Sequence, residues 1–282
     1  MRRFFWVGLM AAAFMSGSVY ATDVARVAEA SMLVRGTVDV LPDGSVANYT
    51  LYKAEKLPAP VVDLIKRSVT TWKFELKEAR TTPLQEEMSL RIVATDAGDR
   101  HVTLHLAGAD FSDEDAPEDA TIRWAHRVSP SYPKFSLDNH MSGTVYVFAR
   151  VGRDGKVIDV AVEQVNLRRY VSDPTMMARF RQDLANAAVL VAKHWTFKAP
   201  TSGDQVNAPF WDAQIPVNFD VDALSSSAAS YGSWEIYVRG PQERIEWLQD
   251  SPFVSETPDA IPDGSIHPLG NGPRLMTPLA TN

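Results

Sequence analysis

The sequence contains no cysteine among its 282 residues. Disulfide bonds, thiol catalysis and thiolate metal ligands are therefore excluded for this chain. The motifs H-E-x-x-H, G-x-S-x-G and G-x-x-x-x-G-K-[ST] are also missing. They mark zinc proteases, serine hydrolases and nucleotide-binding loops, respectively. We therefore expect a protein that is not an enzyme and that uses no cofactor.

Positive charge is scarce. The chain has 28 Lys and Arg against 35 Asp and Glu, which gives a formal net charge of −7. An acidic chain is not expected to bind nucleic acid or an anionic membrane surface. His101 and His105 share one face of a predicted strand, but no third ligand lies near them in the sequence, so we expect no metal site.

Long apolar runs are missing beyond the N-terminus. Residues 1–21 carry two arginines, an apolar core and the sequence Val19-Tyr20-Ala21, which together are typical of a cleaved signal peptide. The apolar core is about a dozen residues long, whereas a membrane-spanning helix needs roughly 20. We expect a soluble periplasmic protein that begins near Thr22. The alternative is an uncleaved segment that stays in the inner membrane as an anchor.

What the sequence does contain is one hairpin pattern written twice. Residues 38–53 read VDVLPDGSVANYTLYK, and residues 151–164 read VGRDGKVIDVAVEQ. In each, an Asp-Gly pair separates two runs rich in β-forming residues, which is a strong hairpin signal because glycine takes the positive φ of the tight turn.

The similarity continues beyond the hairpins. Each is followed by apolar residues at helical spacing, then a Trp-x-Phe sequence, a proline and a further predicted strand, which covers residues 88–94 or 213–221. The predicted fold class is α+β, with two tandem ββαβ units, each a small antiparallel sheet with one packed helix. We expect structural roles for residues at the turns, strand starts and helix ends: Gly36, Asp43, Gly44, Trp72, Phe74, Gly143, Asp154, Gly155, Trp195 and Phe197.

The second unit resembles the C-terminal domain of the TonB family of energy transducers. The resemblance rests on the order of its motifs: Tyr132-Pro133, Gly143, Asp154-Gly155, a helix, Trp195-Thr196-Phe197 and a strand over residues 215–221. The first unit keeps this order but lacks the Tyr-Pro pair, so it resembles a degenerate copy. No proline-rich spacer precedes the units, and a cleaved signal peptide leaves no anchor.

The resemblance implies a binding function. Domains of this family take an extended segment of an outer-membrane receptor as an added strand at a sheet edge. We expect the partner to be a periplasmic or outer-membrane protein segment, with no nucleic acid or small-molecule substrate, and the same edges could pair two copies of the chain. The residues expected at the binding edge are Tyr132, Pro133, Gln214, Ile215, Val217, Asn218 and Phe219.

Two alternatives remain open, an anchored energy transducer and an enzyme with an unrecognised site. Pro216 departs from the expected strand, because proline lacks one main-chain donor and serves either at an outward-facing position or as a block to pairing. The predicted parts are a signal peptide (1–21), the degenerate unit (31–96), an extra strand and acidic linker (97–127), the TonB C-terminal-like domain (128–222) and a largely flexible tail rich in Ser, Pro and Gly (223–282).

Overall fold

The computed structural model describes residues 28–77, 79–98, 101–112, 119–221, 231–248, 260–261, 264–269 and 272–279. The predicted signal peptide lies outside these residues, as does most of the acidic stretch of the linker. Within the described residues no helix is both long and apolar enough to cross a membrane.

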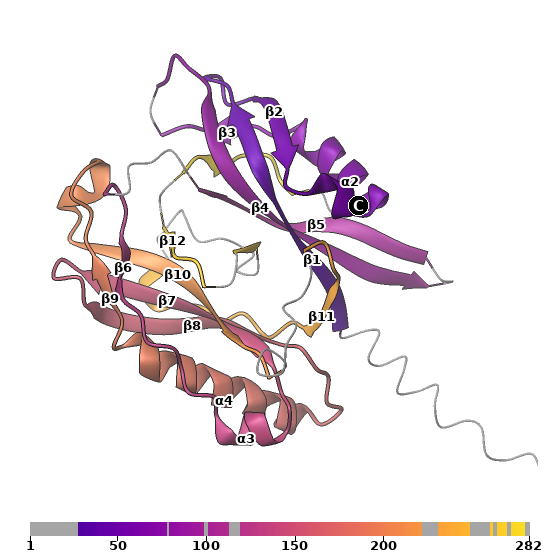
Figure 1. The fold of residues 1–282 in the computed structure, drawn as a ribbon, viewed down its shortest axis with the longest axis vertical. Coiled ribbons are helices and arrows are strands. Elements are labelled where there is room, and N and C mark those ends of the chain that lie inside the picture. The colour runs from indigo at the N-terminus through magenta and orange to yellow at the C-terminus, as the bar shows by residue number, and fades with distance from the viewer. Residues whose placement is uncertain are drawn as a thin grey trace, which may run out of the picture.

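Most strands belong to one nine-stranded antiparallel sheet (Figure 1). Its order is β12-β10-β7-β8-β11-β1-β4-β5, and β2 pairs with β1 beside this path. The strands of this sheet are β1 (Ala28–Val40), β2 (Val46–Leu51), β4 (Leu84–Gly98), β5 (His101–Ser112), β7 (Gly143–Gly152), β8 (Val157–Leu167), β10 (Phe210–Phe219), β11 (Glu235–Val238) and β12 (His267–Pro268).

Short strand pairs and helices complete the described structure. β3 (Phe74–Glu75) pairs with β13 (Arg274–Leu275), and β6 (Arg123–His126) pairs with β9 (Thr196–Lys198). The helices are α2 (Ala59–Val69), α3 (Lys134–Asp138) and α4 (Pro174–Ala192), with 3-10 turns η1 (Ala54–Lys56), η2 (Asp204–Asn207) and η4 (Glu246–Leu248).

Both predicted hairpins form. β1 and β2 pair around Asp43-Gly44, and β7 and β8 pair around Asp154-Gly155. We call β1, β2, α2, β3 and β4 the first repeat, and β7, β8, α4, β9 and β10 the second repeat. In each, the first strand lies between the other two long strands, in the orders β2-β1-β4 and β8-β7-β10.

The predicted α+β class with two tandem small ββαβ units is wrong, because the described structure is mostly β and the strands of both repeats join one large antiparallel sheet. β11 makes the connection. It pairs with β1 over Ala28–Ser31 on one side, and its Val238 pairs with Leu167 of β8 on the other. An unpaired sheet edge leaves main-chain donors and acceptors unbonded, and the added strand satisfies some of these groups.

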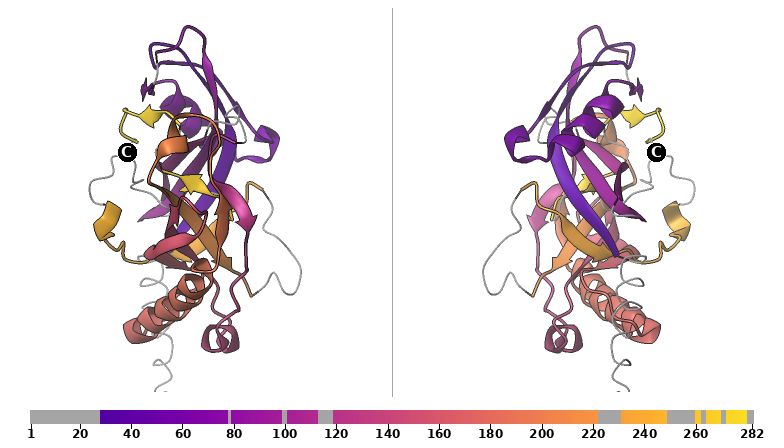
Figure 2. Two further views of the ribbon diagram at one scale, coloured as in Figure 1. Left: turned by 90° about the vertical axis from the view of Figure 1, so that its left-hand side faces the viewer. Right: turned by 90° about the vertical axis from the view of Figure 1, so that its right-hand side faces the viewer.

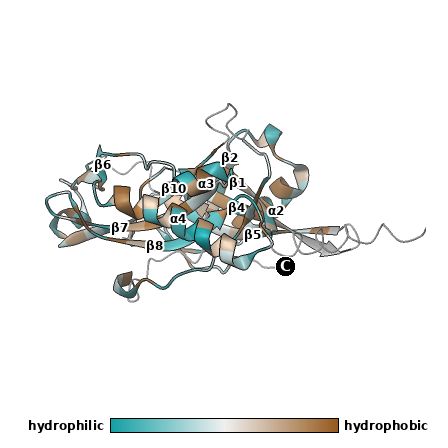
Figure 3. Ribbon diagram, turned by 90° about the horizontal axis from the view of Figure 1, so that it is seen from below, coloured by the Kyte–Doolittle hydropathy of each residue, from teal (hydrophilic) through white to brown (hydrophobic). Residues whose placement is uncertain are grey.

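The helices cover one face of the sheet. In α4 the buried residues recur three or four positions apart, which places them on one side of the helix: Met177, Phe180, Leu184, Ala188 and Val191. They pack against Val145 and Val147 of β7 in one core cluster, while α2 packs against Val34 and Val38 of β1 in another. Seen from the side of α4, the helix shows both hydrophilic and hydrophobic residues, as expected when only one side is buried (Figure 3).

Among the described residues, no α-helix covers the opposite face of the sheet. Because side chains alternate along a strand, Thr144 and Tyr146 of β7 point away from the α4 core, as does Ser31 of β1 from the α2 core. The three residues line a common cavity. The short C-terminal strands β12 and β13 pair with strands of different repeats, and Figure 2 shows them, in yellow, beside both.

Candidate functional site

The candidate binding edge is the outer side of β10, opposite its long pairing with β7. The amide of Leu269 donates to the carbonyl of Asp212 at 2.8 Å, and that of Gly264 donates to the carbonyl of Pro216 at 3.2 Å. Main-chain groups of a strand point to alternate sides from one residue to the next. Gln214 and Asn218 therefore also direct their main-chain N–H and C=O groups outward.

This edge is already partly used by the chain's own C-terminal region. β12 pairs with β10 antiparallel, with Ala213 opposite Pro268 and Gln214 opposite His267. Within the described part of the chain, no strand pairs with the outer edge of β10 from Val217 to Phe219. The described part of the C-terminal segment thus fills only part of a strand-accepting edge.

The equivalent edge in the first repeat is filled much more completely. β4 occupies the place that β10 has in the second repeat, and β5 pairs with it from Glu87↔Ser112 to Gly98↔His101. A hairpin connects β4 to β5. The two repeats thus share a geometry but differ in how much of this edge is available.

The predicted binding residues divide between two faces of β10. Ile215, Val217 and Phe219 are buried in the core beneath α4. Gln214 is also buried, but on the helix-free face, where its side-chain amide donates to the carboxylate of Glu163. Among these residues only Asn218 is exposed, so a partner strand would contact their main chain rather than most of their side chains.

The Tyr-Pro pair lies next to the end of β10. The ring of Tyr132 packs edge-on against Phe219, with ring centroids 5.5 Å apart, and its hydroxyl donates to the carbonyl of Met141 at 2.7 Å. Pro133 is the N-cap residue of α3. In this structure Tyr132 supports the end of the strand, and both residues are partly buried.

Pro216 occupies an outward-facing position. Its carbonyl accepts from Gly264 on the outer side, so its missing N–H also belongs to that side and not to the ladder with β7. The proline therefore leaves the β7–β10 pairing intact and removes one donor from the binding edge. Asn218 carries the next outward donor along the strand.

The two turns are held by equivalent hydrogen bonds. Gly44 and Gly155 have φ values of +79° and +76°, and their carbonyls accept from the amides of Phe74 and Phe197 at 2.8 and 2.7 Å. A methyl group at either glycine would lie about 2 Å from the carbonyl oxygen of the same phenylalanine. Asp43 and Asp154 accept from amides two residues later.

The remaining predicted structural residues pack as two aromatic clusters. Trp72 and Phe74 meet Phe111 of β5, whereas Trp195 and Phe197 meet Trp124 of β6. The Trp195 indole N–H also donates to the carbonyl of Val128 at 2.8 Å. Gly36 and Gly143 lie where the next strand approaches closely, with the carbonyls of Thr50 and Asn166 at 2.0 and 2.6 Å from the position of a Cβ.

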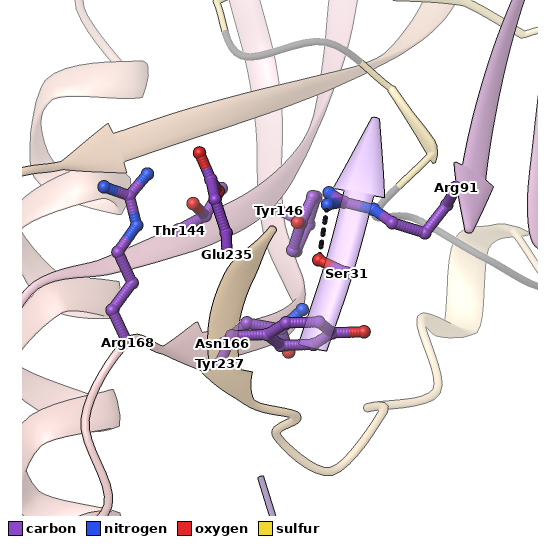
Figure 4. A pocket seen from close by; sticks show the side chains of 8 residues that line it. All are labelled: Ser31, Arg91, Thr144, Tyr146, Asn166, Arg168, Glu235 and Tyr237. Atoms are coloured by element: carbon purple, nitrogen blue, oxygen red, sulfur yellow. Dashed lines mark hydrogen bonds between the residues drawn. The ribbon is translucent and has the colours of Figure 1, made fainter. Parts of the chain in front are cut away.

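A small polar cavity lies where the two repeats meet on the helix-free face (Figure 4). Its side chains come from β1, β4, β7, β8, β11 and Arg168, directly after β8, and they include Arg91, which donates to Ser31 at 2.9 Å. The cavity measures about 20 Å³, which is room for one water molecule. A small-molecule substrate requires a space at least ten times larger.

Sequence reasoning missed a buried polar cluster on this face. Glu163 is 2% exposed and accepts hydrogen bonds from the side chains of Gln214 and Gln242. Nearby, Gln164 and Asn166 bond to the main chain of Gly240. A change of register between Tyr146 and Val147 in the β7–β8 ladder interrupts the strand alternation beside Glu163. No local signal in the sequence marks this irregularity.

Possible metal ligands do not gather in the described residues, where no group of three His, Asp or Glu side chains is placed to hold an ion. His267 of β12 has one carboxylate beside it, since its Nδ1 lies 3.0 Å from Oδ1 of Asp110 in β5. Both side chains are largely buried. The contact connects the first strand of the sheet order with the last.

No protein-family model, curated protein or solved structure matches the chain. The resemblance to the TonB C-terminal domain therefore stays a prediction from the order of the motifs.

Proposed function

We propose that this protein is a non-enzymatic binding protein that takes an extended segment of a partner chain as an added strand at the outer edge of β10. The observation that supports this most directly is β12, which already bonds to that edge through main-chain groups. An edge that accepts a strand from its own chain has the spacing and orientation to accept another, and main-chain hydrogen bonds supply affinity in this mode of recognition.

The place and the partner follow from the sequence. The features of residues 1–21 support export to the periplasm, and the resemblance to the TonB C-terminal domain supports an extended segment of a periplasmic or outer-membrane protein as the partner. The acidic composition favours such a segment over nucleic acid.

Asn218 allows a direct test. Asn218→Pro removes the outward N–H donor, whereas Asn218→Ala keeps it; both remove the contact of the side chain with Arg168. We expect purified extended segments of outer-membrane receptors to be captured by the wild type and by Asn218→Ala, and at least tenfold more weakly by Asn218→Pro. Equal capture by the proline variant, or no capture by any of the three, would refute strand addition at this edge.

A further inference from the structure

We propose that β12 is a resident ligand of the binding edge, and that its side chains define the partner. The edge of β10 and Asp110 of β5 together select an extended segment in which an aliphatic residue is followed by a side chain that pairs with a carboxylate, such as histidine, as in Ile266-His267. The partner segment must displace the resident one before it can bind. This inference rests on the proposed function and adds to it the chemistry of the partner.

The main-chain pairing of the resident segment is short in the described part of the chain. β12 contains two residues, and the bonds from Leu269 and Gly264 extend its contact with β10 by one position on one side and three on the other. The corresponding pairing of β4 with β5 covers most of both strands. A short pairing can exchange with a free segment, whereas the long one in the first repeat is part of the permanent fold.

Two neighbouring side chains of the resident segment are held in different surroundings. Ile266 packs against the core beneath α4. His267, one residue later and therefore on the opposite face, reaches Asp110 at 3.0 Å. The His267 and Asp110 side chains are 15% and 13% exposed, so the contact is shielded from water. An incoming segment must provide the same pair of properties in the same order.

The site is composite, because β10 belongs to the second repeat and Asp110 belongs to β5, the strand that pairs with the first repeat. β10 supplies main-chain groups that bind any extended segment, whereas Asp110 of β5 supplies a carboxylate that distinguishes one segment from another. The strand that fills the edge of the first repeat thereby takes part in recognition at the edge of the second.

The lack of cysteine in the chain permits a clean lock on the resident strand. Ala213 lies opposite Pro268 in the β10–β12 ladder. The pairs on either side of them point their main-chain groups at each other, so Ala213 and Pro268 form a non-hydrogen-bonded antiparallel pair, the type with the shorter Cα separation. The Cα separation of such pairs suits a disulfide. Ala213→Cys combined with Pro268→Cys should therefore tether β12 when oxidised and release it when reduced.

The probe is a fluorescent peptide with the sequence of residues 262–271, whose binding to the full-length protein is followed by anisotropy. We expect it to bind the reduced double-cysteine protein and not the oxidised one. His267→Ala in the protein weakens the resident strand and should raise the apparent affinity of the peptide about tenfold, because the competitor loses its contact with the Asp110 carboxylate. Arg274→Ala, in β13 of the same C-terminal region, is the matched control and should leave affinity unchanged.

Selectivity is tested by a peptide in which the histidine is replaced by alanine. Against His267→Ala protein, this peptide should bind about tenfold more weakly than the original, and the additional change Asp110→Ala should remove the difference. The inference would be overturned if the peptide bound equally to the oxidised and reduced double-cysteine proteins. It would also be overturned if the preference for histidine persisted in the Asp110→Ala protein. If receptor segments were still captured by the wild type and not by Asn218→Pro, the proposed function would hold although this inference had failed.

Discussion

At the scale of single residues, the turn glycines are the positions where the backbone conformation most restricts which amino acid can be accommodated. Gly155 combines φ of +76° with a carbonyl oxygen 2.1 Å from where its Cβ would lie. We expect Gly155→Ala to lower the free energy of unfolding by roughly 1–3 kcal/mol, the usual cost of a strained backbone position. Gly152→Ala is the control, because its nearest contacts, both at 3.2 Å, are side-chain atoms of Asp154 and Ile158 that can move. Urea denaturation measures both, and equal losses would contradict the expectation.

A second residue-scale prediction concerns acid. The side chain and then the amide of Ser45 donate to Asp43 and lower the pKa of its carboxyl from 3.8 to about 2. A folded-state pKa below the unfolded one stabilises the protein above about pH 4, and this contribution disappears as the pH falls toward 2. Asp43→Ala should therefore melt at a lower temperature than the wild type at pH 7, with a difference that narrows between pH 4 and pH 2. A difference that stays constant over this range would argue against the hydrogen-bonded carboxylate as its source.

These turns were predictable because their signal is local: Asp-Gly between β-forming runs determines the hairpin within a few residues. The buried position of Glu163 was not predictable in this way. It depends on an irregularity in the β7–β8 ladder and on amide partners from Gln214 and Gln242, which lie far away in the sequence.

At the scale of elements, adjacent residues of β10 should respond oppositely to proline. Val217 pairs with Val145 and directs its N–H into the ladder with β7, whereas Asn218 directs its N–H outward. We expect Val217→Pro to cost roughly 3 kcal/mol or more, since it breaks a buried ladder bond and strands a carbonyl. Asn218→Pro should cost about 1 kcal/mol or less, as is usual at exposed positions. Denaturant midpoints distinguish the two variants. A similar loss of stability in both would contradict the assignment of an inward N–H to Val217 and an outward N–H to Asn218.

The elements that the sequence predicted well are the long ones with clear periodicity. The predicted helices and third strands correspond to α2, α4, β4 and β10, and residues 101–106 begin β5. β11 and β12 escaped prediction as parts of the sheet, because they are four and two residues long and pair with distant strands. The error in the fold class has the same origin. The first and second repeats join through β11, and no local sequence pattern predicts that this short strand pairs with both.

At the scale of the whole molecule, the C-terminal region ties the repeats together. The Lys73 amide donates to Oγ1 of Thr277 at 2.8 Å beside β3, while Gln214 faces His267 across β10 and β12. A chain that ends at residue 259 should therefore lose hydrogen-exchange protection at both amides together, although one lies in each repeat. Amides inside the β1–β4 ladder serve as the control and should stay protected. Loss at only one site would mean that the two contacts form independently.

The equivalent edges of β4 and β10 are paired to different extents, which suggests how reversible binding could arise. In the first repeat a hairpin joins acceptor strand β4 to its neighbour β5, so that pairing forms once, during folding. The first repeat therefore serves as an internal template for the occupied state of the second. By that template, a partner paired along all 10 residues of β10 would lie extended over about 33 Å. Duplication of one architecture would thus have produced a permanent contact at one end of the molecule and an exchangeable one at the other.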